Sequence, residues 1–434
     1  MPLSTSSCTV PLDAACERKL LALLAAIQFA HIVDFMIMMP LGPILMREFG
    51  IDAHEFGLLV SSYTFTAAIA GLPVAMIADR VERKRLLLTM FGLFALATLA
   101  CGLAPGFATL LAARAAAGAF GGALGSLVHT MVGDLIPFAR RGQASGVIMS
   151  GFSLSTVAGV PLSLFLANAL GWRAPFFFIA ALALCLLALG LRWLPELRGH
   201  LPDAVATDTE RAHPFAAMQA VLREANSRRA FLFMALLMLG GFTVVPYITI
   251  YATANVGIRQ EDVPWLYLSG GFATLFTARW IGRLADRYGK LKVFRGVALA
   301  ALVPLYVLTH LPPVPLAAMI LCATVFFVLV PGRMVPAMAL MTAAVEPRWR
   351  GTFLALNSAV MNLACGLAAW LGGLLMTSEA GRLVGYGRAG FLAMGATLAT
   401  VWLAGRIRLH PAAMPEAGGR HAVPPAPSFT GRDT

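Results

Sequence analysis

The chain has 434 residues, of which 59% are hydrophobic and only 12% are charged, with a formal net charge of +12. Soluble domains carry about 25% charged residues because their surface must face water. The composition therefore excludes a soluble enzyme and predicts a polytopic membrane protein. The basic excess does not indicate nucleic-acid binding, because the lysines and arginines fall between apolar blocks and not along one polar face.

The apolar blocks predict membrane-spanning helices, because each is close to the length needed to cross about 30 Å of hydrocarbon. They lie near 20–43, 55–78, 86–104, 107–133, 144–169, 174–194, 230–255, 264–284, 296–311, 314–344, 351–377 and 389–405. The sequence thus predicts an all-α membrane protein with twelve transmembrane helices.

The distribution of charge predicts the topology. With twelve spans both termini lie on one side of the membrane, and most lysines and arginines fall in the segments on that same side. Positive residues concentrate in cytoplasmic loops, so that side is expected to be the cytoplasm. The expected organisation is a cytoplasmic tail over 1–19, six-helix bundles over 20–194 and 230–406, a cytoplasmic linker over 195–229 and a disordered cytoplasmic tail over 407–434. The first segment lacks the basic start and apolar core of a cleaved signal peptide, so the first block is expected to be retained.

The two halves share landmarks that indicate an internal repeat. Ala78-Asp79-Arg80 follows the second block, and Ala285-Asp286-Arg287 follows the eighth. Arg141-Gly142 follows the fourth block, and Arg350-Gly351 follows the tenth at nearly the same spacing. Many transporters are built from duplicated halves that rock against each other. The repeat therefore supports a division into six plus six helices.

The stretch that follows the eighth block resembles the cytoplasmic loop motif of the major facilitator superfamily. It places Gly282, Asp286, Arg287 and Gly289 before further basic residues, as that motif does. With the twelve-span layout, the resemblance covers roughly 20–406. It implies two six-helix bundles with a central solute pathway between them.

The copy after the second block keeps Asp79 and Arg80 but departs from the family pattern by carrying Glu82 where a glycine is expected. A carboxylate at a helix end can pair with charges on a neighbouring helix and hold the cytoplasmic ends together in one state. We therefore predict that both loops act in gating. The alternative for each is that its charges only set topology.

Arg114 in the fourth span lies in a sequence similar to the intramembrane-arginine motif of the family's proton-coupled members. An isolated arginine in hydrocarbon is costly, so it must face a wet cavity or a partner. Asp34 in the first span lies at a similar predicted depth and is the natural partner. His31 shares its helix face at i, i+3. These three residues are the candidates for proton coupling, with a structural pair as the alternative.

Two further spans carry unusual patterns. The fifth has small residues at four-residue steps from Gly151 to Ser163 with Pro161 among them, and it resembles a degenerate form of the family's antiporter motif. Such a stripe permits close helix approach. The tenth is interrupted by Pro331, Gly332 and Arg333, which predicts a helix break that lines a cavity or is buried. Arg333 is therefore either a substrate contact or part of a hinge.

Polar residues within the spans are candidates for the solute pocket, although each alone is more often a packing residue. Besides Arg114 and Arg333, they are Gln28, Tyr63, Tyr247, Tyr251, Asn357 and Asn362. No phosphate-binding loop of the Gly-x4-Gly-Lys-Ser/Thr type is present, so ATP-driven transport by this chain is not expected. No cofactor or metal site is predicted either.

The expected function is secondary active transport, with proton-coupled export of a small organic solute resembling the drug and sugar efflux branch of the family. A transporter of organic anions such as carboxylates or carboxylate siderophores is the first alternative, because two arginines in the spans outnumber one clear acid. A non-transporting sensor or scaffold is the second. The excess of arginine over lysine is typical of a GC-rich bacterial genome, so the expected location is a bacterial inner membrane. The expected partners are solute, protons and lipid, and the chain is expected to act as a monomer.

Overall fold

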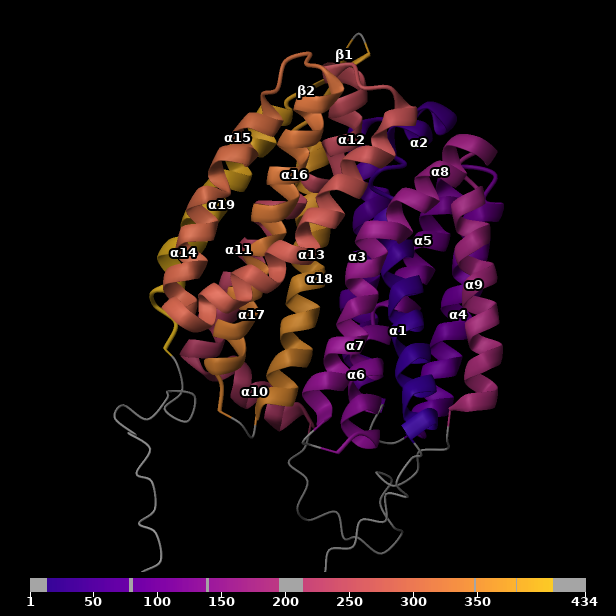
Figure 1. Ribbon diagram of the computed structural model, residues 1–434, viewed down its shortest axis with the longest axis vertical. Helices are drawn as coiled ribbons and strands as arrows, with labels where there is room; N and C mark the ends of the chain where they lie inside the picture. The colour runs from indigo at the N-terminus through magenta and orange to yellow at the C-terminus, as the bar shows by residue number, and fades with distance from the viewer. Residues whose placement is uncertain are drawn as a thin grey trace, which may run out of the picture.

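The computed structural model describes residues 14–77, 81–137, 140–194, 214–346, 349–379 and 381–408. Its helices form two bundles that lie side by side, the first indigo to magenta and the second orange to yellow (Figure 1). Both described ends of the chain lie at the same end of the bundles, which we call the terminal end. The opposite end, with α2, α12 and the only hairpin of the described chain, is the far end.

The N-terminal half contains the helices that match the first six predicted spans. They are α1 (Ala14–Ile37), α2 (Gly42–Phe49), α3 (Ala53–Ile77), α4 (Arg83–Leu103), α5 (Phe107–Gly121), α6 (Leu124–Leu135), α7 (Arg141–Leu154), the π-helical turn η2 (Ser155–Gly159), α8 (Val160–Leu170) and α9 (Ala174–Trp193). The helix α2 was not predicted, because the first apolar block continues past the end of α1.

The C-terminal half begins inside the expected linker over 195–229, where α10 and the start of α11 were not predicted. Its helices are α10 (Pro214–Arg223), α11 (Ala225–Phe242), η3 (Val245–Tyr247), α12 (Ile248–Tyr251), η4 (Ala252–Val256), η5 (Gln260–Asp262), α13 (Val263–Tyr288), α14 (Lys290–Ala300), α15 (Leu302–Thr309), α16 (Leu316–Gly332), α17 (Met334–Ala343), α18 (Arg350–Leu374) and α19 (Tyr386–Ala404). Strands β1 (Thr377–Glu379) and β2 (Arg382–Val384) pair antiparallel between α18 and α19.

Ten helical stretches are long and apolar enough to cross a membrane. Two further helices, α13 with 26 residues and α19 with 19, are of spanning length but less apolar, because arginines such as Arg279 and Arg388 lie within them. The all-α membrane fold is therefore confirmed, and the structure is consistent with twelve spans. The starts of α7 at Arg141 and α18 at Arg350 are equivalent points of the predicted repeat.

Several spans are interrupted where glycine or proline occurs. The fourth span divides into α5 and α6 at Gly122, and the tenth divides into α16 and α17 at Arg333, as its prolines predict. In the fifth span a π-helical turn precedes Pro161. The small residues of that span pack on α1, where the Ser155 hydroxyl donates to the Phe29 carbonyl at 3.1 Å. The predicted stripe thus serves a close helix contact.

Buried apolar side chains form three clusters that differ between the two ends. The cluster at the far end includes residues of both halves, such as Val33, Phe56, Tyr247 and Phe326. At the terminal end each half has its own buried core, with Leu72 of α3 as a partly buried neighbour of the C-terminal one. The halves therefore share a core at the far end and have separate cores at the terminal end.

Candidate solute and proton site

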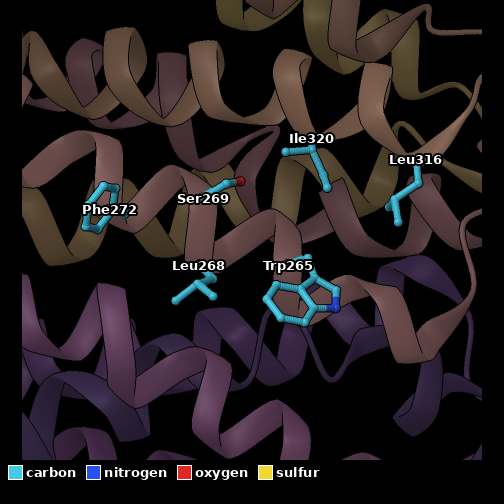
Figure 2. A pocket seen from close by; sticks show the side chains of 6 residues that line it. All are labelled: Trp265, Leu268, Ser269, Phe272, Leu316 and Ile320. Carbon is cyan, nitrogen blue, oxygen red and sulfur yellow. The ribbon is translucent and has the colours of Figure 1, made fainter.

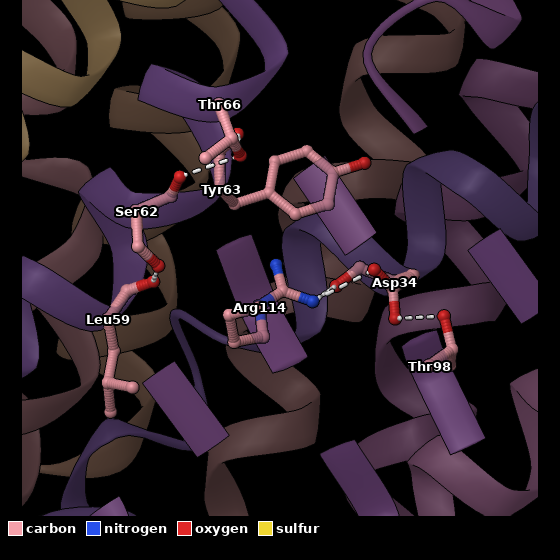
Figure 3. Close-up of polar contacts among 7 residues, drawn as sticks. All are labelled: Asp34, Leu59, Ser62, Tyr63, Thr66, Thr98 and Arg114. Carbon is pink, nitrogen blue, oxygen red and sulfur yellow. Dashed lines mark hydrogen bonds and ion pairs between the residues drawn. The ribbon is translucent and has the colours of Figure 1, made fainter. Parts of the chain in front are cut away.

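The centre of the N-terminal half holds a buried ion pair between α1 and α5. The Arg114 Nη1 atom lies 2.8 Å from Asp34 Oδ2, and the two side chains are 1% and 0% exposed. Thr98 of α4 donates to the other carboxylate oxygen of Asp34 at 3.2 Å. The contact expected from the sequence between Asp34 and Arg114 is confirmed, and Figure 3 shows the pair with Thr98 beside it.

The pair lies where α1 is about to end. Asp34 is within the last turn of that helix, which finishes at Ile37, and Arg114 Nη1 also donates to the Asp34 main-chain carbonyl at 3.3 Å. The last four carbonyls of a helix lack partners within the helix, and a cation there is favoured by the helix dipole. The guanidinium therefore stabilises both the carboxylate and the helix end.

The aromatic ring of Tyr63 on α3 covers the other side of the guanidinium. The Arg114 Cζ atom lies 4.6 Å from the ring centroid, a cation–π distance (Figure 3). The helices α3 and α5 approach closely because Gly118 has no side chain. A Cβ atom there would lie 2.5 Å from Thr66 Oγ1 and even closer to the Tyr63 carbonyl. Substituting Gly118 would therefore disturb the ring that covers Arg114.

Four buried polar atoms on α1, α3 and α5 have no hydrogen-bond partner in the described part of the chain: Gln28 Oε1, His31 Nδ1, Tyr63 Oη and Arg114 Nε. Buried polar atoms in native proteins are nearly always bonded to protein, water or ligand. The Tyr63 hydroxyl and the His31 ring both lie beside Gly121, where a Cβ atom would lie 2.5 Å from Tyr63 Oη and 3.2 Å from His31 Cδ2. The set can therefore accept a small polar ligand or water.

The face of α1 that carries His31 reaches the other half at Phe35. Phe35, one turn after His31, contacts the Phe242 ring of α11 with centroids 6.1 Å apart. The same Phe35 ring lies 5.4 Å from that of Tyr63. The Tyr63 ring thus lies next to an aromatic contact between the halves, and His31 lies one turn before Phe35 on α1.

Arg333 lies in a different environment, at the break between α16 and α17. It is 1% exposed, and its Nη1 donates to Thr397 Oγ1 of α19 at 2.6 Å. Its Nη2 donates to the Leu237 carbonyl of α11 at 3.4 Å. No carboxylate pairs with it among the residues that the structure describes. The structure therefore does not bring Arg333 to the Asp34–Arg114 pair.

The remaining candidates for the pocket lie in the C-terminal half. Tyr247 donates to the Ala369 carbonyl at 2.6 Å, and Tyr251 donates to the Leu311 carbonyl at 3.0 Å, both near the far end. Asn357 is buried with its amide nitrogen 3.3 Å from a methionine sulfur, and its Oδ1 has no partner among the described residues. Asn362 is half-buried. None of the four has a recorded contact with the Asp34–Arg114 pair.

The gating candidates lie at the terminal end where the structure describes them. Asp286 and Arg287 are exposed on the last turn of α13. Asp286 has no ion pair with any residue in the described ranges. Gly289 joins α13 to α14 with a φ of 94°, a conformation that favours glycine. Gly282 is half-buried nearly two turns before the end of α13, whereas Asp79 and Arg80 lie outside the described residues.

An apolar groove of about 570 Å³ lies between α13 and α16. Figure 2 shows its lining side chains, which are Trp265, Leu268, Ser269, Phe272, Leu316 and Ile320. Its one hydroxyl, from Ser269, accepts a hydrogen bond from Thr324 at 3.0 Å. Large apolar side chains such as Phe272 are exposed there, as expected of a surface in contact with lipid tails. None of the predicted site residues lines this groove.

Sequence reasoning missed the hydroxyl groups that complete both arginine sites. Thr98 bonds Asp34, and Thr397 bonds Arg333, yet each is one of many threonines in an apolar span. Hydroxyls within helices usually bond a carbonyl of their own helix, as Thr66 does with Ser62 at 2.9 Å. The local sequence does not distinguish a hydroxyl that bonds its own helix from one that bonds a side chain on another helix.

Comparison with known proteins identifies the family. The sequence model of the family described as Major Facilitator Superfamily matches residues 24–369 of the chain. The chain therefore belongs to the major facilitator superfamily, which is a family of membrane transporters and not of enzymes.

Relatives and solved structures agree with this placement. A "Probable sugar efflux transporter" of Helicobacter acinonychis (strain Sheeba) is 24% identical over 246 residues, 57% of this chain and 60% of the relative. That of Helicobacter pylori (strain P12) is 27% identical over 204 residues, 47% of this chain and 50% of the relative. The matches thus cover 50–60% of the length of these relatives.

Two solved structures share the fold. A bacterial homologue of the human lysosomal transporter Spinster, in an inward-facing and unoccupied conformation, matches with a TM-score of 0.72 at 17% identity, over 92% of this chain and 100% of that one. The nucleoside transporter NupG, in a mutant form, matches with 0.70 at 15% identity, over 90% and 99%. At these identities the likeness concerns the fold alone.

Proposed function

We propose that the chain is a proton-coupled exporter of a small organic solute that works by alternating access. The observation that carries the proposal is the buried Asp34–Arg114 pair at 2.8 Å, the one ion pair of the described chain with both side chains fully buried. Breaking a buried pair leaves an uncompensated charge, so a proton on Asp34 changes the interactions available to Arg114. A proton and a solute can then compete for the same pair.

The two ends of the bundles support the alternating-access cycle. The halves share a buried core at the far end and keep separate cores at the terminal end. We assign the terminal end to the cytoplasm of a bacterium, following the arginine-rich loops. The structure then corresponds to the state that is closed outward, in which the solute enters from the cytoplasm. A monomer suffices for this cycle.

The solute that fits the site best is neutral and carries hydroxyl groups. The charge of Arg114 is already matched by Asp34. Of the unpartnered atoms, Gln28 Oε1 can only accept a hydrogen bond and Arg114 Nε can only donate one, so a ligand that bonded both would need a donor and an acceptor. Sugars have this chemistry, and the relatives are named as probable sugar efflux transporters. We therefore place sugars first among the solutes to test.

The coupling is tested with Asp34→Asn in proteoliposomes. The amide keeps the shape but binds no proton, so we expect proton-driven solute flux to fall at least tenfold while solute-driven exchange without a proton gradient persists. Asp262→Asn is the matched control, since Asp262 pairs with Arg259 in a far-end loop. Proton-driven flux that is unchanged in Asp34→Asn would refute the role of Asp34.

A transporter of organic anions is the second candidate, because Arg333 is a buried charge with no carboxylate partner in the described chain. A carboxylate solute could supply that partner. The same proteoliposomes separate the two candidates: faster flux of a neutral sugar than of a carboxylate supports the first, and the reverse order supports the second.

We further propose that Asp286, with Asp79, holds the terminal ends together in the outward-open state. Asp286 is exposed in this structure, in which the halves have separate cores at the terminal end. The change Asp286→Asn should lower the transport rate several-fold and leave solute affinity within a few-fold, since typical couplings are about 1–3 kcal/mol. Cysteine probes on the terminal side should gain access to α7 and α18.

The matched control for this latch is Glu261→Gln, which changes a carboxylate at the far end. Its transport rate and probe access should stay at the wild-type level. Lost solute binding with unchanged probe access in Asp286→Asn would place this aspartate in the binding site or in folding, and the latch would be rejected.

A further inference from the structure

A hydrogen bond between two rings joins the halves at the far end. The indole Nε1 of Trp370, on α18, donates to Nε2 of His54, on α3, at 3.2 Å. The two residues are 316 positions apart in the chain. Both are half-buried, so neither ring is enclosed by the protein. This contact lies beside the shared core that closes the far end.

The chemistry of the two rings makes this bond sensitive to protonation. An indole nitrogen donates a hydrogen bond and accepts none. His54 can accept the bond only while its Nε2 carries no hydrogen. A proton added to Nε2 makes it a second donor that faces the first, and the bond is lost. Histidine is the side chain that changes charge between about pH 5 and pH 8.

The backbones of α3 and α18 approach each other closely beside this bond. A Cβ atom on Gly373 would lie 2.8 Å from the Ala53 carbonyl and 3.0 Å from the His54 Cα. The helices α3 and α18 are therefore in backbone contact next to the bond. Loss of the bond can be relieved by separating the two helices at this end, which is the movement that opens the far side.

The charged and titratable groups around His54 have other partners. Asp52 and Glu55 bond each other's main-chain amides at 2.7 and 3.0 Å at the start of α3. The groups on the elements packed against the start of α3 are Arg47 and Glu48 of α2, Tyr247 of η3 and Glu379 of β1. The Tyr247 hydroxyl donates its hydrogen bond to the Ala369 carbonyl. No residue of the described chain other than Trp370 has a recorded hydrogen bond to the His54 ring.

We propose that His54 is a second proton-binding site, at the far-end seam, and that its protonation releases Trp370 and favours opening of that side. This goes beyond the coupling proposed for Asp34. The two sites lie on different helices, and protonation of His54 acts directly on a contact between the two halves. Acid on the far side then promotes the state that releases solute and takes up protons. The proton gradient would thus influence the direction of transport first at the contact that closes the far end.

The test measures far-end separation by electron–electron spin distances on the full chain, in a background without native cysteines. Labels at Leu170 and Val384 report the two halves, since both side chains are exposed at this end. The measurement is made with Asp34→Asn present, so that a response of the coupling site does not contribute. We expect the open population to rise about two- to tenfold between about pH 8 and about pH 5.5, the range expected for one hydrogen bond.

Two variants and one control complete the test. His54→Gln keeps an acceptor without the proton, so the seam should stay closed at both pH values. Trp370→Phe lacks the donor, so its open population should be raised equally at both. His310→Gln removes a far-end histidine that bonds only within the C-terminal half and should respond like the parent. A response that persists in His54→Gln, or no response in the parent, would overturn the proposal, whatever the outcome for Asp34.

Discussion

Replacing Arg114 by glutamine is expected to destabilise the protein by about 3–5 kcal/mol, the range found when one member of a buried ion pair is removed. The reason is that Asp34, which is 0% exposed, would keep its charge without a partner. The Tyr63 ring would also lose the cation that it covers. We expect a clear fall in the melting temperature of the solubilised protein.

The double variant Asp34→Asn with Arg114→Gln should recover most of that loss, because neither side chain is then charged. Acidification should also reduce the deficit of the single variant, since a proton on Asp34 removes the buried charge. Arg173→Gln is the matched control: Arg173 lies 3.9 Å from Glu48 and is 43% exposed, so its loss should cost less than about 1 kcal/mol. A double variant as unstable as the single one would show that the pair is not the cause.

Replacing Gly373 by alanine is expected to force the far end open. The new Cβ would lie 2.8 Å from the Ala53 carbonyl of the other half, and a backbone atom cannot move aside as a flexible side chain can. Overpacking of this kind costs about 1–3 kcal/mol. The halves can avoid the cost by separating, so the closed state should lose roughly five- to hundredfold in population. Spin distances between Leu170 and Val384 measure the change.

The neighbouring glycine provides the control. A Cβ on Gly372 would lie 2.7 Å from the Thr243 carbonyl and 2.8 Å from the Tyr247 ring, both in the same half as itself. Gly372→Ala should therefore lower the stability of the C-terminal half without separating the far ends. If Gly372→Ala and Gly373→Ala give the same spin distances, the contact across the seam does not control opening.

The sequence by itself determined the helical membrane fold and the break in the tenth span. Hydropathy over about 20 residues is a local property, and so are the prolines and glycines that interrupt a helix. The division of the tenth span near Arg333 could therefore be predicted, and the structure has it. The contact between Asp34 and Arg114 also followed from the sequence, because a charge within a span needs a partner at its own depth.

The tertiary structure alone decided which side chains surround that pair and which lie elsewhere. Helices that are apolar on every side carry no stripe from which their orientation can be read. The hydroxyl of Thr98, the ring of Tyr63 over Arg114 and the placement of Tyr247 at the far end therefore appear only once the helices are packed. The same holds for the bond between His54 and Trp370, because a contact between residues 316 positions apart depends on how two bundles meet.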